Sequence, residues 1–269
     1  MPCLNAEEAL TNAKPLKVGL VGCGGRGLGA MKNALDADPG TIAWALADVF
    51  QERIDFGAKL LAEQYGNRAR LDRSRLFSGL DSYKRLLQTD IDVVLLCTPP
   101  AFRPEHLAAA VDASKHIYAE KPVAVDVPGV LSVLESARLA KLKNLVILDG
   151  FCWRYDKANE EAHRKLSSGQ LGRVLSFDGL YYTTPPKSPL ALDSRPSSDT
   201  DVAWALRNWT AWNWLSGGQF VEQIVHTIDG MVWSMNEQLP LAAFGSGGRA
   251  QRRDDGDVWD HYDVYFEYG

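Results

Sequence analysis

A glycine-rich turn near the start of the chain has the spacing that binds a dinucleotide. Residues 22–27 read Gly-Cys-Gly-Gly-Arg-Gly and fit G-x-G-x-x-G, directly after an apolar run and before a helical pattern. In this context Gly22 permits a tight turn, Gly24 lets the backbone approach a pyrophosphate, and Gly27 lets the helix pack closely on the strand. The helix N-terminus adds free N–H groups and a partial positive charge. We therefore predict a cofactor site, with Arg26 on a phosphate, made by Gly22, Cys23, Gly24, Gly25, Arg26 and Gly27. The alternative is a flexible turn that binds nothing.

Asp48 stands where such a site would meet the ribose of the nucleotide. It follows the apolar run 41–47 and lies 21 positions after Gly27. A carboxylate there accepts hydrogen bonds from ribose hydroxyls and repels a 2′-phosphate. Asp48 therefore favours NAD over NADP as the cofactor. The alternative is an aspartate in a solvent-exposed turn.

Two more motifs follow apolar runs of the same kind. T-P-P (98–100) comes after residues 91–97, and E-K-P (120–122) comes after residues 116–119. If both runs are parallel strands, the motifs lie at the carboxyl edge of the sheet, where open α/β sheets bind ligands. The Lys121 ammonium could there donate a hydrogen bond to a substrate hydroxyl and favour the developing alkoxide.

The elements that would position these residues alternate between strand and helix. Helical patterns separate apolar runs at 16–22, 41–47, 91–97, 116–120 and 144–150. This alternation predicts an α/β, doubly wound parallel sheet over residues 1–150. The pattern changes in residues 151–269, where we expect helices at 157–168 and from Gly217 to about Trp233, and alternating strands at 173–184 and near the end. The second half therefore reads as an α+β domain.

The composition is that of a folded globular protein and narrows the possible partners. The 269 residues are 46% hydrophobic and 23% charged, with a net charge of −5. An acidic chain argues against nucleic acid or an anionic membrane as the main partner. No apolar run reaches the roughly 18 residues needed to span a bilayer, and the first residues lack the apolar stretch of a signal peptide. The four scattered cysteines form no C-x-x-C pair, so we expect neither a metal knuckle nor a disulfide framework, and a cytoplasmic location.

Three motifs in this order resemble the Gfo/Idh/MocA family of NAD(P)-dependent oxidoreductases, named for glucose–fructose oxidoreductase and inositol dehydrogenase. They read VGLVGCGGRG, CTPPAFRPEH and KHIYAEKPVAVD. The later segment RNWTAWNWLSGGQFVEQIVHTIDGMVW is similar to the helix that carries the catalytic histidine of this family. The resemblance implies a Rossmann domain followed by an α+β domain with a mostly antiparallel open sheet.

The resemblance also assigns roles to single residues. The further cofactor-binding residues that it implies are Thr98, Pro99, Pro100, His106, Glu120 and Lys121. Lys121 would also be the substrate-binding and catalytic lysine, and the peptide bond before Pro122 would be cis. Arg154 and Tyr155 would border the substrate. For His106 the alternative is a packing role at the start of a helix, and for Arg154 and Tyr155 it is an interdomain hinge packed by aromatics.

Glu222 and His226 would complete the substrate site from the second domain. Many relatives carry an aspartate at the position of Glu222, so the glutamate is a departure. The i, i+4 spacing predicts that both side chains share one helical face, and the adjacent Gln223 is expected to face away. A histidine in the position of His226 can accept a hydroxyl proton, while Glu222 would orient the imidazole or bind a substrate hydroxyl. The alternatives are a core histidine, or two metal ligands that lack an evident third.

The leading hypothesis is an NAD-dependent oxidoreductase that acts on a secondary hydroxyl of a sugar, cyclitol or polyol. A second hypothesis is a redox-neutral glycoside hydrolase or lyase that recycles its NAD. A third is a non-catalytic NAD-binding regulator, against which the presence of both Lys121 and His226 speaks. A homo-oligomer would form through the sheet of the second domain, if that sheet is complete.

The end of the chain predicts an incomplete second domain. Members of the family are generally longer, because their second domain is a broad open sheet. This chain ends at YDVYFEYG, which reads as the first half of a hairpin in that sheet. We therefore expect a complete NAD-binding domain over 1–150 and a truncated substrate and oligomerisation domain over 151–269. An incomplete sheet would have an unpaired edge that favours pairing with another chain.

Overall fold

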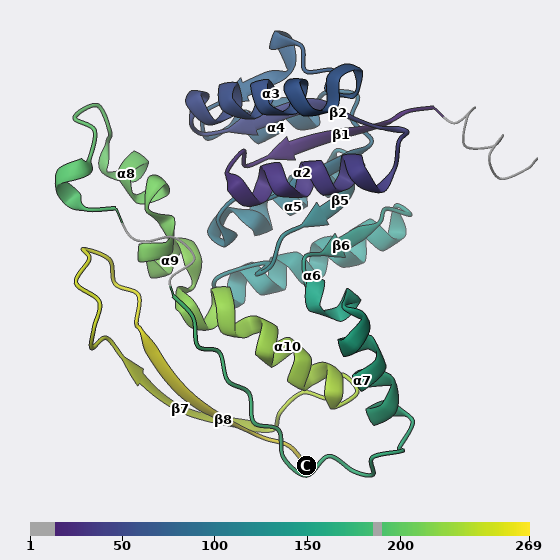
Figure 1. Ribbon diagram of the computed structural model, residues 1–269, viewed down its shortest axis with the longest axis vertical. Coiled ribbons are helices and arrows are strands. Elements are labelled where there is room, and N and C mark those ends of the chain that lie inside the picture. Colours follow the sequence, from purple (N-terminus) through teal and green to yellow (C-terminus); the bar gives the residue numbers. More distant parts are fainter. Residues whose placement is uncertain (1–13, 185–189) are drawn as a thin grey trace, which may run out of the picture. The chain divides into compact units, whose positions relative to one another are not determined.

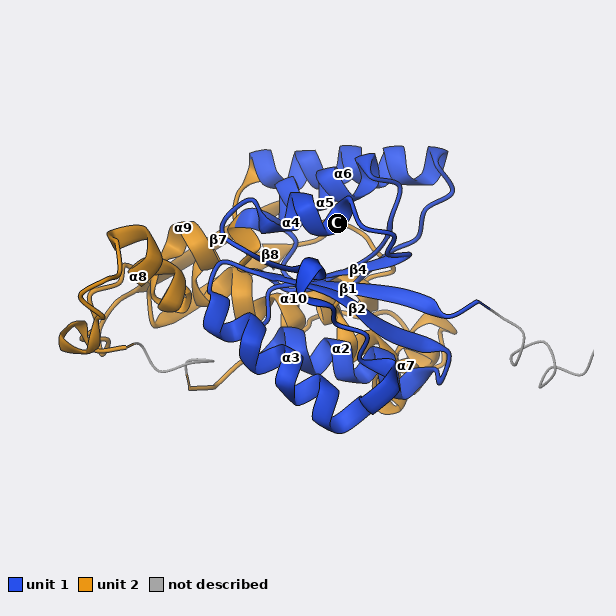
Figure 2. Ribbon diagram, turned by 90° about the horizontal axis from the view of Figure 1, so that it is seen from above, with its two compact units in different colours: residues 1–98, 102–123, 128–149 blue, residues 99–101, 124–127, 150–269 orange. Residues whose placement is uncertain are grey.

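The computed structural model describes residues 14–184 and 190–269 of the chain, which divide into two compact units. The first unit holds the described residues up to Thr98, then 102–123 and 128–149. The second unit holds 99–101, 124–127 and the described part of 150–269 (Figure 2).

A six-stranded parallel sheet forms the centre of the first unit. Its order is β3-β2-β1-β4-β5-β6, and its strands are β1 Leu16–Val21, β2 Thr41–Asp48, β3 Leu76–Ser78, β4 Val93–Leu96, β5 His116–Ala119 and β6 Ile147–Asp149. The inner strands read as nearly continuous apolar runs because both faces of a parallel sheet are buried. The strand order reverses between β1 and β4, which is the point where doubly wound sheets bind nucleotides. The predicted α/β Rossmann fold is thus confirmed.

Two helical layers cover this sheet. Helices α2 Gly25–Ala37 and α3 Gln51–Tyr65 lie on one face, and α4 Ser82–Leu87, α5 Arg103–Asp112 and α6 Val127–Leu142 lie on the other (Figure 2). Leu35 and Leu61 belong to the apolar core under the first pair of helices. Leu86, Leu107 and Ala140 belong to the core under the other three. The two cores fix the helices and hence the turns at the carboxyl ends of the strands.

The second unit combines short helices with a small antiparallel sheet (Figure 1). Its helices are α7 Lys157–Ser167, α8 Asp201–Arg207, α9 Asn213–Ser216 and α10 Val225–Ser234, and a π-helical turn, Phe220–Ile224, leads directly into α10. Strands β7 Ala242–Gly248 and β8 His261–Glu267 pair in antiparallel register. The predicted α+β class of this half is therefore confirmed.

The strand predicted at 173–184 is wrong. The segment is extended but pairs with no strand among the described residues, and Leu175 and Tyr182 are 83% and 90% exposed. An alternating pattern becomes a strand only when a neighbour accepts its backbone hydrogen bonds. The one ladder in the described part of this unit joins β7 to β8, so the backbone groups of 173–184 have no ladder to enter.

Candidate active site

The glycine turn of the first unit has the geometry that its sequence predicts. Gly22 has φ +99°, and a Cβ there would lie 2.8 Å from the Cys97 carbonyl. A Cβ on Gly27 would lie 1.8 Å from the Gly22 oxygen, so only glycine allows α2 to pack this closely on the turn. Gly24 and Gly25, by contrast, face open space, with nothing within 4 Å of an added Cβ. The open side of the turn, at the N-terminus of α2, fits a pyrophosphate.

Asp48 is joined to the same turn by backbone hydrogen bonds. Its carboxylate accepts from the Cys23 amide at 2.7 Å and from the Phe50 amide at 2.9 Å. The side chain is buried, so the aspartate is part of the turn and not an exposed loop residue. A carboxylate fixed beside the glycine turn is what the hydroxyls of a nucleotide ribose require.

Arg26 and Glu120 form an ion pair with each other. The Arg26 Nε donates to Glu120 Oε1 at 2.6 Å, and the Tyr118 hydroxyl donates to the same oxygen at 2.7 Å. Burial, together with this bond to Glu120, raises the pKa of Tyr118. The network links the start of α2 to the end of β5, so the predicted phosphate contact and the predicted ribose contact share one hydrogen-bonded group.

A buried arginine ties the T-P-P motif to the E-K-P motif. Arg103 is 2% exposed and donates to the carbonyl oxygens of Thr98 and Pro122. The peptide bond between Lys121 and Pro122 is cis, as expected. Lys121 itself is half-buried at this edge. The carboxyl ends of β4 and β5 are thereby held together through their backbones.

The side chain of His106 is buried and packs against neighbouring side chains. Its ring is 5% exposed, contacts Tyr83 at 4.1 Å between ring centroids, and approaches Thr98 Oγ1 at 3.2 Å through Nδ1. Burial, with the nearby charges of Arg103 and Lys84, lowers the pKa of His106 to about 3. The imidazole is therefore neutral near neutral pH and supports Thr98. Of the neighbouring prolines, Pro100 is buried and Pro99 is half-buried.

In the second unit His226 lies within a group of aromatic rings. Trp153 stacks on the imidazole at 4.8 Å between centroids, and Phe151 meets it edge-on at 6.1 Å. Tyr181 stacks on Trp153 at 6.1 Å. His226 is 8% exposed and lines a cavity of about 380 Å³ together with Trp153 and Trp233. The stack fixes the plane of the ring.

Arg154 is held by acidic side chains of the same unit. It makes hydrogen bonds to both carboxylate oxygens of Asp229, the shortest 2.7 Å, and another to Glu237 at 2.8 Å. The bond to Asp229 is the main cause that raises the pKa of Arg154. The guanidinium lines the His226 cavity, whereas Tyr155 is 58% exposed.

Glu222 and His226 each line a cavity of the second unit, and that of His226 is the cavity of about 380 Å³ described above. Glu222 lines a separate cavity of about 300 Å³. Gln223, expected to face away, is 7% exposed and lines the cavity of Glu222. Glu222 and Gln223 belong to the π-helical turn over 220–224, and i→i+5 hydrogen bonds widen such a turn and rotate its residues relative to the α-helix that follows.

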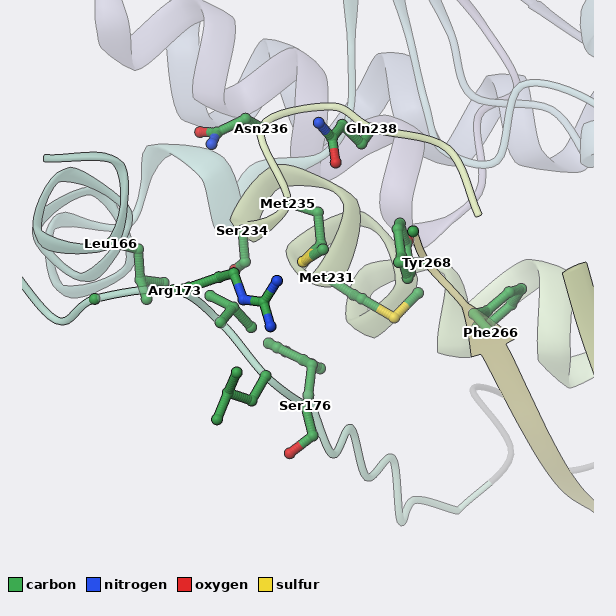
Figure 3. A pocket seen from close by; sticks show the side chains of 15 residues that line it. Leu166, Arg173, Ser176, Met231, Ser234, Met235, Asn236, Gln238, Phe266 and Tyr268 are labelled. Carbon is green, nitrogen blue, oxygen red and sulfur yellow. The ribbon is translucent and has the colours of Figure 1, made fainter. Parts of the chain in front are cut away.

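A third cavity of about 520 Å³ contains none of the predicted site residues (Figure 3). Met231 and Met235 reach it from the end of α10, Phe266 and Tyr268 from the end of β8, and Arg173 from the extended segment. Its wall mixes apolar groups with Arg173, Tyr268 and a few hydroxyls and amides, and its lining residues include no His, Asp, Glu or Lys.

Sequence reasoning missed the residues that support the predicted ones. They are Arg103, Tyr118, Trp153, Thr210 and Arg252. Arg103 and Tyr118 stand inside the quoted family motifs, and Trp153 directly precedes Arg154, so their places could have drawn notice. Thr210 stands inside the quoted segment RNWTAWNWLSGGQFVEQIVHTIDGMVW, whereas Arg252 lies in a segment without a motif. Among the described residues no group of three or more His, Cys, Asp or Glu side chains is placed to hold a metal ion.

The first part of the chain matches a known protein family. A family model described as "Oxidoreductase family, NAD-binding Rossmann fold" matches residues 16–147. The match confirms the predicted cofactor, NAD, and the open glycine turn is the feature of this structure that fits it. In the described part of the chain, no helix has both the length and the apolar character needed to cross a bilayer.

Curated relatives and solved structures extend the similarity into the second unit. A dTDP-3,4-didehydro-2,6-dideoxy-alpha-D-glucose 3-reductase of Actinomadura kijaniata is 28% identical over 181 residues, 67% of this chain and 49% of the relative. An inositol 2-dehydrogenase of Salmonella typhimurium is 25% identical over 227 residues, 82% of this chain and 55% of the relative. The chain thus spans about half the length of these curated relatives. The solved structure of GenD2 from gentamicin A biosynthesis, in complex with NAD, shares the fold with a TM-score of 0.68 at 22% identity, covering 95% of this chain and 63% of that one.

Proposed function

Because the chain belongs to the Gfo/Idh/MocA family of oxidoreductases, we propose that it is an NAD-dependent enzyme that interconverts a secondary hydroxyl and a ketone on a sugar, cyclitol or related polyol. The printed names of its relatives, a deoxysugar 3-reductase and an inositol 2-dehydrogenase, belong to this class of reaction. The observation that carries the proposal is the glycine turn, which is open at Gly24 and Gly25 and bound to Asp48.

The first unit supplies the cofactor site in this proposal. The amides at the start of α2 bind the pyrophosphate, and the Asp48 carboxylate binds ribose hydroxyls. Glu120, held by Arg26 and Tyr118, orients the nicotinamide ribose. When bound at this site, NAD would supply the hydride acceptor of the reaction.

Lys121 and His226 handle the substrate hydroxyl. The Lys121 ammonium donates a hydrogen bond to the hydroxyl oxygen and stabilises the negative charge that develops on it. The His226 imidazole takes up the hydroxyl proton, and its ring is held for this by the stack on Trp153. Glu222 and Tyr155 bind further substrate hydroxyls, and Arg154 positions the substrate from the wall of the His226 cavity.

The proposed enzyme is cytoplasmic and assembles with further copies of itself. Cys23, Cys97 and Cys152 are free thiols, the usual state in a reducing compartment. Phe244 and Tyr265 are exposed on the β7–β8 sheet, which gives that sheet an apolar surface for association. Light scattering coupled to size exclusion tests this part, and a well-behaved monomer at all concentrations would contradict it.

A screen of sugars and cyclitols with the purified chain and NAD, followed at the NADH absorbance, tests the proposed reaction. We expect one NADH for each product molecule with at least one polyol, and loss of this signal in Lys121→Met. Product formation without NADH would instead favour a redox-neutral reaction. Absence of NAD binding would contradict the proposal as a whole.

A further inference from the structure

The cavity beside Glu222 is built mainly from three segments of the second unit, and Thr183 of the extended segment 173–184 completes its wall. The first runs from 209 to 216, the second is the π-helical turn, and the third is the connection 249–260 between β7 and β8. The Asp257 amide donates to the Ala211 carbonyl at 3.0 Å, and the Asn213 amide donates to the Asp257 carboxylate at 2.6 Å. A Cβ on Gly256 would lie 2.0 Å from the Ala211 oxygen. The connection is therefore seated on the first segment by close backbone contact.

The same connection is closed on itself around Asp260. The Asp260 carboxylate accepts from the backbone amides of Ala250, Gln251 and Arg252, at 3.0, 2.7 and 2.9 Å. These bonds lower the pKa of Asp260 and set the direction in which the Arg252 side chain leaves the backbone. The cavity wall is thus preformed, which limits the entropy that a ligand would lose on binding.

Two buried polar atoms in this wall have no hydrogen-bond partner among the described residues. They are the Thr210 hydroxyl, on a residue 8% exposed, and Nη2 of Arg252. Arg252 is held through its Nε, which donates to Asp254 at 2.8 Å, and its side chain is 12% exposed. A buried polar group without a partner is costly, so a ligand that places an oxygen beside each of these atoms would recover the missing hydrogen bonds.

The charges in the wall select an uncharged ligand. Apart from Gly218 and Val258, every residue that lines the cavity is polar, but carbon atoms form more of the lining surface than nitrogen and oxygen atoms do. This mixture suits a ligand that has both C–H faces and hydroxyl groups. A carboxylate or phosphate would meet the carboxylates of Glu222 and Asp260, while Arg252 is already shared with Asp254. A cation would meet Arg252. Hydroxyl groups, which both donate and accept, match the mixture of amides, hydroxyls and charges.

We infer that this cavity is a subsite for the uncharged, hydroxyl-bearing part of the substrate, and that Thr210 and Arg252 determine specificity there. The inference rests on the proposed function, since it takes the bound polyol to be the substrate. At about 300 Å³ the cavity is at the small end of ligand sites, so it holds one monosaccharide or cyclitol ring or one arm of a larger substrate. Glu222 joins it as an acceptor, and the proton transfer remains at His226.

Ligand-observed saturation-transfer NMR and calorimetry on the full chain test the inference without following turnover. The probes are myo-inositol and D-glucose, with D-glucuronate as the acidic counterpart. We expect at least one neutral probe to bind, and glucuronate to bind at least tenfold more weakly. Thr210→Val, which keeps the shape but removes the hydroxyl, and Arg252→Met should each weaken the neutral probe roughly tenfold.

Two matched variants separate recognition from loss of structure. Thr210→Ser retains the hydroxyl and should keep the binding of the wild type. Arg253→Met changes an exposed neighbouring arginine outside the cavity wall and should have no effect. Unchanged binding in both Thr210→Val and Arg252→Met, equal binding of glucuronate, or no binding of any probe would each overturn the inference. A protein that binds NAD and forms NADH but shows one of these results would keep the proposed function and lose only this subsite.

Discussion

The two units hold their candidate site residues by different means. In the first unit several contacts go to the backbone, since Asp48 binds two amides and Arg103 binds two carbonyls. Side chains join one another there only in part, as in the group of Arg26, Tyr118 and Glu120. In the second unit the contacts join side chains, since His226 stacks on Trp153 and Arg154 binds Asp229 and Glu237. A contact between a charged side chain and the backbone depends little on the types of the residues that supply the backbone groups, except at the glycines. The cofactor site is therefore the constant part of this architecture, and the substrate site is the part that substitutions can readily change.

The largest expected effect tests this division of labour. His226→Ala removes the group that takes the proton, so kcat should fall by roughly 10²–10⁴-fold. The affinity for NAD should remain that of the wild type, because the cofactor contacts belong to the first unit. Steady-state kinetics on the best polyol of the screen, with calorimetry of NAD binding, measure the two quantities. A variant that loses NAD affinity in parallel would break the separation.

Removal of Arg103 tests the backbone frame of the first unit. Arg103→Met leaves the buried carbonyls of Thr98 and Pro122 without their donor, and the free energy of unfolding should fall by about 3 kcal/mol. Arg138→Met is the matched control, since Arg138 pairs with Glu135 on the exposed surface of α6 and should change stability by less than about 0.5 kcal/mol. Urea denaturation measures both. Equal effects would show that the frame does not depend on this arginine.

Low pH should also lower the free energy of unfolding, because His106 is protonated more readily in the unfolded chain. Because the folded pKa of about 3 lies below the ordinary value of about 6.5, the unfolded chain binds the proton first as the pH falls. The contribution of the buried, neutral His106 to the free energy of unfolding is complete above pH of about 6.5. Below that pH it is lost progressively, by about 2 kcal/mol at pH of about 5. In His106→Gln the fall in unfolding free energy between neutral pH and pH of about 5 should be smaller by this amount. An unchanged pH dependence would show that the ring is not buried as described.

The smallest effect concerns the ion pairs of the second unit. Asp229 is 12% exposed at its side chain and Glu237 is 58% exposed, and both bind Arg154. Asp229→Asn should therefore destabilise by about 1 kcal/mol, and Glu237→Gln by less than about 0.5 kcal/mol. Thermal unfolding of the two variants gives the comparison. The reverse order would mean that burial does not govern these pairs.

The sequence predicts the first unit well because its signals are local. The glycines of 22–27 act on their own turn, and Asp48 ends the strand beside it, so spacing along the chain is enough. The structure of the second unit depends on features that short-range sequence patterns do not show. The π-helical turn that contains Glu222 and directly precedes the helix of His226 cannot be recognised from an i, i+4 pattern. The alternation of 173–184 likewise does not show whether a neighbouring strand is present.

The side chains that support the candidate site residues could not be predicted from the sequence for the same reason. Arg252 reaches the Glu222 cavity only because its loop is seated on residues some forty positions earlier, through contacts such as that of Asp257 with Ala211. The role of Trp153 depends on its stack with His226, which lies far along the chain. Residue type and spacing cannot show such contacts, which arise when distant segments pack.

The most direct test of the central claim, that the glycine turn of this chain is an NAD site, is calorimetry of NAD binding to the wild type and two glycine variants. An added methyl at Gly24 or at Gly29 meets nothing within 4 Å in the protein, but only the one on Gly24 occupies the space in front of α2. We predict saturable binding of one NAD per chain, unchanged in Gly29→Ala and weakened roughly tenfold, about 1.4 kcal/mol, in Gly24→Ala. No binding to the wild type, or equal binding to all three proteins, would contradict the account.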